Sequence, residues 1–463
     1  MPNHRFPRAS AAIAAGLVFA TVFATAGCPN REVSRVDPGQ EKEEFKDIPL
    51  TINRDIDILF VIDNSMSMGQ EQASLVANFP KFTQILDNIE GGLPNVHIGV
   101  VSSDMGSLNT NFNACGGLGD NGGLRKGGGD CGINGQFIRN VEDGSGGRIT
   151  NHGANDRLSQ AFACAAELGD QGCGFEQHLE AMRAALTNNT VNAGFLRPNA
   201  KLAVVIVADE DDCSVKNPGF WGPQSEALGF PDSFRCTEFG IECEGPSDPR
   251  TSGPRTDCAP IENSQFMYTR AEIQSRYVDF LKGLKQDPMD IIVAGIIGNV
   301  EPVEVGRRDA DGASVPALLP SCRYPAPGGG EQNARPGVRL RYFLEQFPNR
   351  NQVTTICDDD LSDALVQIAE LLATVIGNPC IEGNLKMPVE CVASYVTDPG
   401  QDNEVEQLLP KCSSDTGTPT NQPCWRLIQD PNCTDYPTGL SIEVVRTQDP
   451  PPDTHIFARC ATE

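Results

Sequence analysis

Three oxygen-bearing side chains stand at alternating positions in the run Asp63-Asn64-Ser65-Met66-Ser67. A carboxylate and two hydroxyls with this spacing can all face one cation, and Mg²⁺ prefers a site that offers few carboxylates and keeps several waters. Asp and Ser are also favoured at helix N-termini, where their side chains accept hydrogen bonds from backbone N–H groups. These five residues alone therefore leave a metal site and a helix cap as open alternatives.

A second acidic group, Asp209-Glu210-Asp211-Asp212, could hold a further cation, but beyond Asp209 a solvated acidic turn explains it equally well. No other part of the sequence combines a nucleophile with a base. The histidines lack the H-x-x-x-H spacing of zinc enzymes, and no phosphate-binding glycine loop ends in Lys-Ser or Lys-Thr. We therefore expect a binding protein and not an enzyme.

The elements that must position these residues follow from the hydrophobic pattern. Residues 56–62 form an apolar run without alternation, typical of a buried parallel strand, and 69–89 have apolar side chains at the spacings of an amphipathic helix. Further strands are expected at 96–101, 202–208, 290–297 and 352–356, and further helices at 175–186, 271–284 and 361–376. This alternation predicts an α/β fold with a doubly wound, mostly parallel sheet. Asp63 then follows the carboxyl end of a strand, where such sheets bind ligands.

Three insertions, 106–150, 213–262 and 300–335, each follow the carboxyl end of an expected strand, so they should crowd around the same edge of the sheet. The first has 13 glycines between Gly116 and Gly147, which favours a flexible lid or spacer. The α/β domain should span 49–378. Residues 379–463 contain six cysteines and short β-prone segments, which predict a small Cys-rich, β-rich C-terminal module.

The segment VIDNSMSM after a buried strand, followed by an amphipathic helix and a later strand that ends in Val207-Ala208-Asp209, resembles the von Willebrand factor type A domain. The resemblance covers about 52–376, less the insertions. It implies a metal-ion-dependent adhesion site (MIDAS) built by three loops. By position, Asp63, Ser65 and Ser67 would form the first loop and Asp209 the third.

The second loop departs from the family pattern, because Glu176 falls where the family has Thr. Glu176 can still be a ligand, and an additional carboxylate suits Ca²⁺ better than Mg²⁺. The expected cofactor is a divalent metal, Mg²⁺ first, with Ca²⁺ or Mn²⁺ as alternatives. The resemblance implies a ligand-binding or adhesion protein whose protein or polysaccharide partner presents a carboxylate to the metal. The alternative is an envelope scaffold that binds partners without metal.

Compartment and partners are indicated by charge and by the N-terminus. The 463 residues have a formal net charge of −26 with no basic stretch, which excludes nucleic acid as a partner. Residues 1–27 have a basic start, an apolar middle and small residues at the end, as an export signal does. The following Cys28 resembles the acylated cysteine of bacterial lipoproteins, and ordinary cleavage after Ala26 is the alternative. Residues 28–48 would then be a tether.

The cysteines point to the same compartment. Of the 17 cysteines, 16 remain when Cys28 is set aside. Ten of them precede position 379 and six follow it, and both numbers are even, as two separately cross-linked domains would require. Structural disulfides are typical of oxidising compartments. We expect an extracytoplasmic protein that is anchored in the outer membrane or at the cell surface and touches the membrane only through its lipid; without the lipid it would be periplasmic or secreted.

Overall fold

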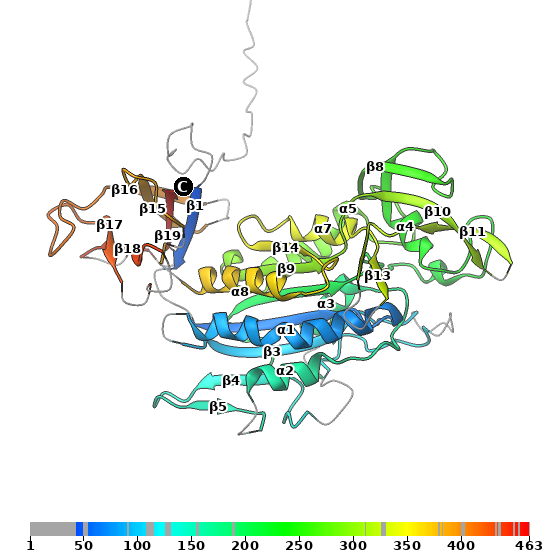
Figure 1. Ribbon diagram of the computed structural model, residues 1–463, viewed down its shortest axis with the longest axis horizontal. Helices are drawn as coiled ribbons and strands as arrows, with labels where there is room; N and C mark the ends of the chain where they lie inside the picture. Colours follow the sequence, from blue (N-terminus) through cyan, green and yellow to red (C-terminus); the bar gives the residue numbers. More distant parts are fainter. Residues whose placement is uncertain are drawn as a thin grey trace, which may run out of the picture.

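Figure 1 shows a computed structural model of the protein. It describes residues 43–49, 54–89, 92–107, 115–125, 131–153, 157–187, 190–310, 312–325, 330–377, 380–381, 383–399, 403–430, 433, 437–447, 450–451 and 454–462. The predicted export signal, Cys28 and residues 28–42 of the predicted tether lie outside these ranges. Among the described helices, none combines the length and apolarity that crossing a membrane requires.

A seven-stranded sheet forms the centre of the molecule, in the order β14-β9-β6-β2-β3-β4-β5. Its five parallel strands are those expected from the apolar runs: β2 (Asp55–Ile62), β3 (Asn95–Ser102), β6 (Lys201–Ala208), β9 (Ile291–Ile297) and β14 (Asn351–Thr355). The middle three are buried along nearly their whole length, which explains why their sequences do not alternate. The predicted α/β class with a mostly parallel sheet is confirmed.

Helices cover both faces of this sheet (Figure 1). One hydrophobic cluster joins the sheet to α1 (Gly69–Asp87), α2 (Leu158–Ala166) and α8 (Ser362–Gly377). The cluster on the other face involves α3 (His178–Thr187), the continuous helical segment α5-η3-α6 (Arg270–Ile273, Gln274–Val278, Asp279–Lys282) and α7 (Val338–Leu344). Each strand therefore packs apolar side chains in two directions, as a doubly wound sheet requires.

The first insertion differs from its prediction. Part of it forms an antiparallel hairpin, β4 (Ile138–Glu142) and β5 (Arg148–Thr150), that extends the central sheet beyond β3. The expectation of a flexible lid or spacer is therefore wrong for residues 138–150. The sequence of the insertion does not reveal this, because β3 leaves a row of unpaired backbone groups that only tertiary structure brings to the hairpin.

The other two insertions meet in a separate β-structure at the carboxyl end of the sheet, at the right of Figure 1. A four-stranded sheet, β11-β10-β8-β7, combines β7 (Ile241–Glu244) and β8 (Gly253–Pro260) with β10 (Val303–Ala310) and β11 (Ala313–Leu318). Helix α4 (Phe234–Gly240) and the hairpin β12 (Cys322–Pro325) and β13 (Glu331–Ala334) complete it. These two insertions thus gather at one edge, as predicted, whereas the β4–β5 hairpin of the first insertion pairs with the start of β3, away from that edge, so the prediction is wrong for this hairpin.

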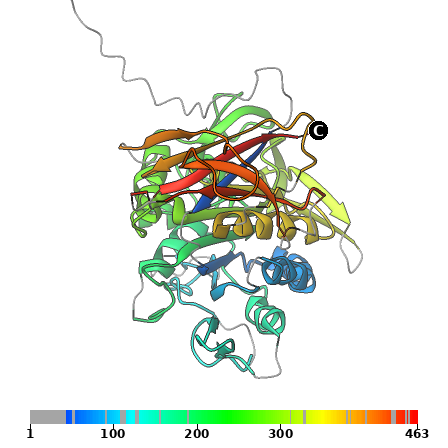
Figure 2. The same cartoon turned by 90° about the vertical axis from the view of Figure 1, so that its left-hand side faces the viewer.

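The C-terminal module lies at the opposite end and faces the viewer in Figure 2. Its sheet has the order β1-β19-β15-β16, from β1 (Glu43–Pro49), β19 (Thr454–Ala461), β15 (Cys391–Thr397) and β16 (Val405–Leu409). A hairpin of β17 (Cys424–Gln429) and β18 (Leu440–Val445) packs with it. Residues 43–48 were expected to be tether, but they pair with the C-terminal strand β19. A partner some 400 residues distant leaves no local sequence signal.

Eight disulfides connect the sixteen cysteines after Cys28. Five pairs lie within the α/β domain and three within the C-terminal module. The prediction that the cysteines of each domain pair only with one another is therefore confirmed. The pairs are 115–173, 131–164, 213–236, 243–258 and 322–357, then 380–433, 391–460 and 412–424. This many disulfides indicates an oxidising, extracytoplasmic environment.

Candidate functional site

The predicted first and third loops meet at the carboxyl end of the central sheet. Asp63 and Asp209 follow β2 and β6, which are parallel neighbours, and the Asp63 amide donates to the Val207 carbonyl over 2.9 Å. The two carboxyl groups lie within hydrogen-bonding reach of each other. Both are buried, with exposed fractions of 0% for Asp63 and 2% for Asp209. Adjacent strand ends therefore bring together residues that are 146 positions apart in the sequence.

The hydroxyls of the first loop complete a row of oxygens. The Ser65 amide donates to Asp63 Oδ1 over 2.7 Å, the Ser65 and Ser67 hydroxyls lie 3.1 Å apart, and Ser67 hydrogen-bonds with the Asp209 carboxyl. Neither Ser65 nor Met68, the two residues at the N-cap positions here, makes a side-chain cap hydrogen bond. Helix capping therefore does not account for the two serines. Ser67 is exposed, so the row opens to solvent.

The buried carboxylates of Asp63 and Asp209 have few hydrogen-bond partners. Among the described residues, Asp63 Oδ2 and Asp209 Oδ1 have no hydrogen-bond partner, although both atoms are inaccessible to solvent. Burial raises the pKa of Asp63 to about 7, a shift that the hydrogen bond from the Ser65 amide opposes. Burial and the charge of Asp63 raise the pKa of Asp209 well above its usual range. Two adjacent buried carboxylates need a proton or a cation between them.

The second loop brings Glu176 to the same place. Its side chain is 2% exposed, hydrogen-bonds with Glu210, and is close enough to Asp63 and Asp209 for their charges to interact with it. Burial, together with the charge of Glu210, raises the pKa of Glu176 well above its usual range. The loop is held by the Cys115–Cys173 disulfide. The five residues predicted from the sequence are thus neighbours in space.

Five further residues belong to this neighbourhood and were not assigned to the site from the sequence: Glu71, His178, Glu210, Tyr324 and Arg335. Glu210 lies beside Glu176, with the Arg335 guanidinium 3.9 Å from its carboxyl. His178 Nε2 lies 3.9 Å from Asp63 Oδ2, and burial lowers the pKa of His178 to about 4, so this imidazole is neutral. The Tyr324 hydroxyl donates to Glu71 at the start of α1. Of these, only Glu210 had a sequence signal, its place next to Asp209.

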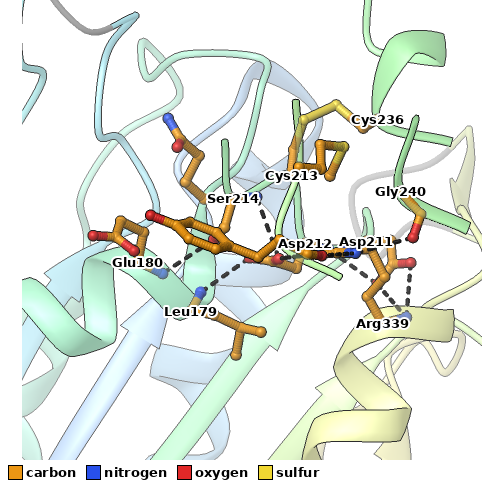
Figure 3. A network of polar contacts seen from close by, with 12 residues as sticks. Leu179, Glu180, Asp211, Asp212, Cys213, Ser214, Cys236, Gly240 and Arg339 are labelled. Atoms are coloured by element: carbon orange, nitrogen blue, oxygen red, sulfur yellow. Dashed lines mark hydrogen bonds and ion pairs between the residues drawn. A yellow bond between two sulfur atoms is a disulfide. The ribbon is translucent and has the colours of Figure 1, made fainter. Parts of the chain in front are cut away.

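The rest of the acidic turn is structural. Figure 3 shows Asp212 accepting hydrogen bonds from the Leu179 amide at the start of α3, over 3.0 Å, and from Arg339. Asp211 accepts hydrogen bonds from the backbone amides of Arg339 and Leu340, at the start of α7. Asp212 is 0% exposed, so the alternative of a solvated turn is wrong for this residue. These two carboxylates tie α3 and α7 to the third loop.

A cleft opens beside the carboxylates, between the third loop and the two later insertions. Its cavity volume is about 70 Å³, and its lining includes Glu176 and Glu210 from the second and third loops and Arg308 and Arg335 from the third insertion. Arg308, from the third insertion, pairs with Asp232, from the second. A molecule that approaches the first loop from this side therefore meets both acidic and basic side chains.

Among the described residues, no group of three or more His, Cys, Asp or Glu side chains is arranged to hold a metal ion unaided. A cation at this edge would therefore need the hydroxyls of Ser65 and Ser67 and water, together with Asp63 and Asp209. This donor set suits Mg²⁺, which retains several waters in protein sites. The unpartnered Asp63 and Asp209 oxygens are the observation that fits a cation.

No family model matches the chain, and no curated protein matches it in sequence. Weakly similar solved structures include the pilus adhesin SpaC from Lactobacillus rhamnosus GG, 13% identical over 92% of this chain and 44% of that one, with a TM-score of 0.31. A von Willebrand factor type A protein from Catenulispora acidiphila is 9% identical over 93% and 67% (TM-score 0.26). The pilus adhesin RrgA from Streptococcus pneumoniae is 11% identical over 91% and 58% (TM-score 0.27). This chain spans less than half of SpaC.

Proposed function

We propose that this protein is an extracytoplasmic binding protein that holds a divalent cation at the carboxyl end of its central sheet and binds a partner's carboxylate through it. The observation that carries the proposal is the pair of buried, unpartnered oxygens, Asp63 Oδ2 and Asp209 Oδ1, beside two serine hydroxyls. A buried polar atom without a partner destabilises the folded protein, so the retention of two such atoms beside the exposed Ser67 favours a ligand.

Each residue has a distinct role in this proposal. Asp63 and Asp209 supply the negative charge that attracts the ion, and Ser65 and Ser67 supply neutral oxygens. Glu176, from the second loop, would act on the ion through a bound water, and its extra charge would make Ca²⁺ or Mn²⁺ a competitor of Mg²⁺. The bound ion supplies a positive charge, which a strongly acidic protein otherwise lacks, to a carboxylate of the partner.

The partner we propose is a protein or a polysaccharide that carries carboxylates, bound without catalysis at the cell envelope. Lipidation at Cys28 would anchor the chain. The strand β1, which contains the last residues of the predicted tether, lies in the C-terminal module at the end of the molecule opposite the first loop (Figures 1 and 2). An anchor on that side would leave the candidate metal site facing away from the membrane.

Calorimetric titration with Mg²⁺, Ca²⁺ and Mn²⁺ tests the metal site directly. We expect binding by the wild-type protein, no binding by Asp63→Ala, and unchanged binding by Asp363→Ala, a matched control because Asp363 is exposed on α8. Equal binding by Asp63→Ala and the wild type would contradict the proposal. If the protein binds an envelope partner equally well with and without chelator, the metal-independent scaffold is the correct alternative.

A further inference from the structure

His178, at the start of α3, is a buried imidazole that the described fold does not use. Its exposed fraction is 0%, and neither ring nitrogen has a hydrogen-bond partner among the described residues. Burial lowers the pKa of His178 to about 4, so the side chain is neutral at physiological pH. A neutral imidazole has one N–H donor and one acceptor nitrogen, and leaving both unpaired in the interior destabilises the folded state. The retention of such a group calls for an explanation.

The Nε2 atom of His178 lies near Oδ2 of Asp63. The distance between these two atoms is 3.9 Å, about 1 Å longer than an ordinary N–H···O hydrogen bond. The Asp63 oxygen also lacks a hydrogen-bond partner within the described ranges, and the Asp63 side chain is 0% exposed. A donor and an acceptor that could satisfy each other therefore lie close together in the interior without making a hydrogen bond.

The main chain at His178 is held on both sides. The amide of Gln177 donates over 3.0 Å to the carbonyl of Ser103, the residue directly after β3. The amide of Leu179 donates over 3.0 Å to Asp212 Oδ1 (Figure 3). These two hydrogen bonds tie the start of α3 to the carboxyl end of the sheet. The gap between the imidazole and the first-loop carboxyl group can therefore close by side-chain rotation alone.

A bound cation would favour this closure. An ionised carboxylate offers about four lone-pair positions on its two oxygens. On Asp63, the Ser65 amide occupies one position of Oδ1 over 2.7 Å, and a cation would occupy another. A position on Oδ2 remains for the N–H group of His178. Hydrogen bonds to an ionised acceptor are shorter and stronger than those to a neutral one.

We propose that His178 is a positioning residue for the candidate metal site: its Nε2–H group donates to Oδ2 of Asp63 and holds this carboxylate in place for a divalent cation. Side chains that hydrogen-bond to a metal ligand orient it, and their loss typically lowers metal affinity by about 10- to 100-fold. The inference rests on the proposed function, because His178 acts on the ion only through Asp63. It also assigns the proton of the neutral imidazole to Nε2 and not to Nδ1.

Calorimetric titration of the full-length protein with Mg²⁺ tests this role. His178→Leu removes both nitrogens, so we expect it to bind Mg²⁺ at least about tenfold more weakly than the wild type. His178→Gln carries an NH₂ donor in place of Nε2–H, so its affinity should stay close to that of the wild type. His97→Gln is the matched control, because His97 is also buried but its Nδ1 lies 2.9 Å from the Phe195 carbonyl. Its Mg²⁺ affinity should be unchanged.

Thermal denaturation in chelator separates this role from a structural one. Leucine keeps much of the side-chain volume and removes two unpaired buried polar atoms, so the melting temperature of metal-free His178→Leu should equal or exceed that of the wild type. Loss of Mg²⁺ affinity without loss of stability is the result that a merely structural imidazole would not give. If leucine does not fit and the melting temperature falls, NMR spectra of the wild type decide.

Those spectra are long-range ¹H–¹⁵N correlations of protein with ¹⁵N-labelled histidine. We expect the His178 signals, assigned by their absence from His178→Gln, to show the Nε2–H tautomer and to shift when Mg²⁺ is added. Wild-type protein that binds no divalent metal would overturn the proposed function and this inference together. If the wild type binds Mg²⁺, equal affinity in His178→Leu or an Nδ1–H tautomer in the Mg²⁺-bound protein would overturn this inference alone.

Discussion

Replacing Asp63 by Asn should stabilise the metal-free protein while it abolishes metal binding. The Asp63 side chain is fully buried, and its Oδ2 atom has no hydrogen-bond partner in the part of the chain that the structure describes. Asparagine has nearly the same shape, and its oxygen can still accept from the Ser65 amide. Its NH₂ group can donate to the adjacent Asp209 carboxyl, which lies within hydrogen-bonding reach. The substitution therefore removes a buried charge without opening a cavity.

The magnitude follows from the pKa. Burial raises the pKa of Asp63 from 3.8 to about 7, and each pKa unit corresponds to about 1.4 kcal/mol. Above pH 7 the buried charge therefore lowers the free energy of unfolding by about 4 kcal/mol. Between the two pKa values the folded state binds more protons than the unfolded chain, so stability falls as pH rises through this window. Asp63→Asn removes that part of the pH dependence.

The assay is denaturation followed by circular dichroism, with disulfides intact, at pH 4 and pH 8 and with chelator or Mg²⁺. In chelator, we expect Asp63→Asn to exceed the wild type in stability at pH 8 and to match it near pH 4. With Mg²⁺, only the wild type should gain stability, because ligands that bind the folded state stabilise it by mass action. A variant less stable than wild type in chelator at pH 8 would refute the reasoning.

Three other changes test separate parts of the structure. Asp212→Ala leaves the buried Arg339 charge without its partner and should cost about 3–5 kcal/mol of unfolding free energy; a loss below 1 kcal/mol by chemical denaturation would contradict the role of this pair. Burial lowers the pKa of His97 to about 4, so the unfolded chain takes up a proton first as pH falls below 6.5. Stability should then decline by up to about 3 kcal/mol between pH 6.5 and 4, and His97→Gln should flatten this decline in denaturation curves. Glu176→Thr removes one carboxylate from the candidate site and should raise the Mg²⁺ over Ca²⁺ preference at least tenfold in calorimetry; an unchanged ratio would mean that Glu176 is not a ligand.

Much of the central fold could be predicted, because its signals are local. The run 56–62 and its counterparts are apolar throughout since parallel strands are buried on both faces, and amphipathic spacing marked α1. The placement of Asp63 at a strand end followed from this alternation. The sequence left open whether Ser65 and Ser67 cap a helix. Only the hydrogen bonds that these two side chains make in the folded protein answer this question.

Elements whose partners are distant left no comparable signal. The β4–β5 hairpin has only a few buried side chains and depends on the free edge of β3, while β1 depends on the C-terminal strand β19. The same holds for charges. Asp211 and Asp212 look in the sequence like a solvated acidic turn, yet they are held by the start of α7 and by Arg339, 127 positions further along the chain.

The amino-acid sequence by itself determined the α/β alternation, the even division of cysteines and the presence of a carboxylate with two hydroxyls after a buried strand, because each of these is a property of neighbouring residues. Only the tertiary structure decided that Asp63, Glu176 and Asp209 share one buried place beside Glu210, and that His152 is buried with neither nitrogen paired to a described residue. Burial and contact between distant segments depend on how strands and helices pack, and no local pattern encodes them.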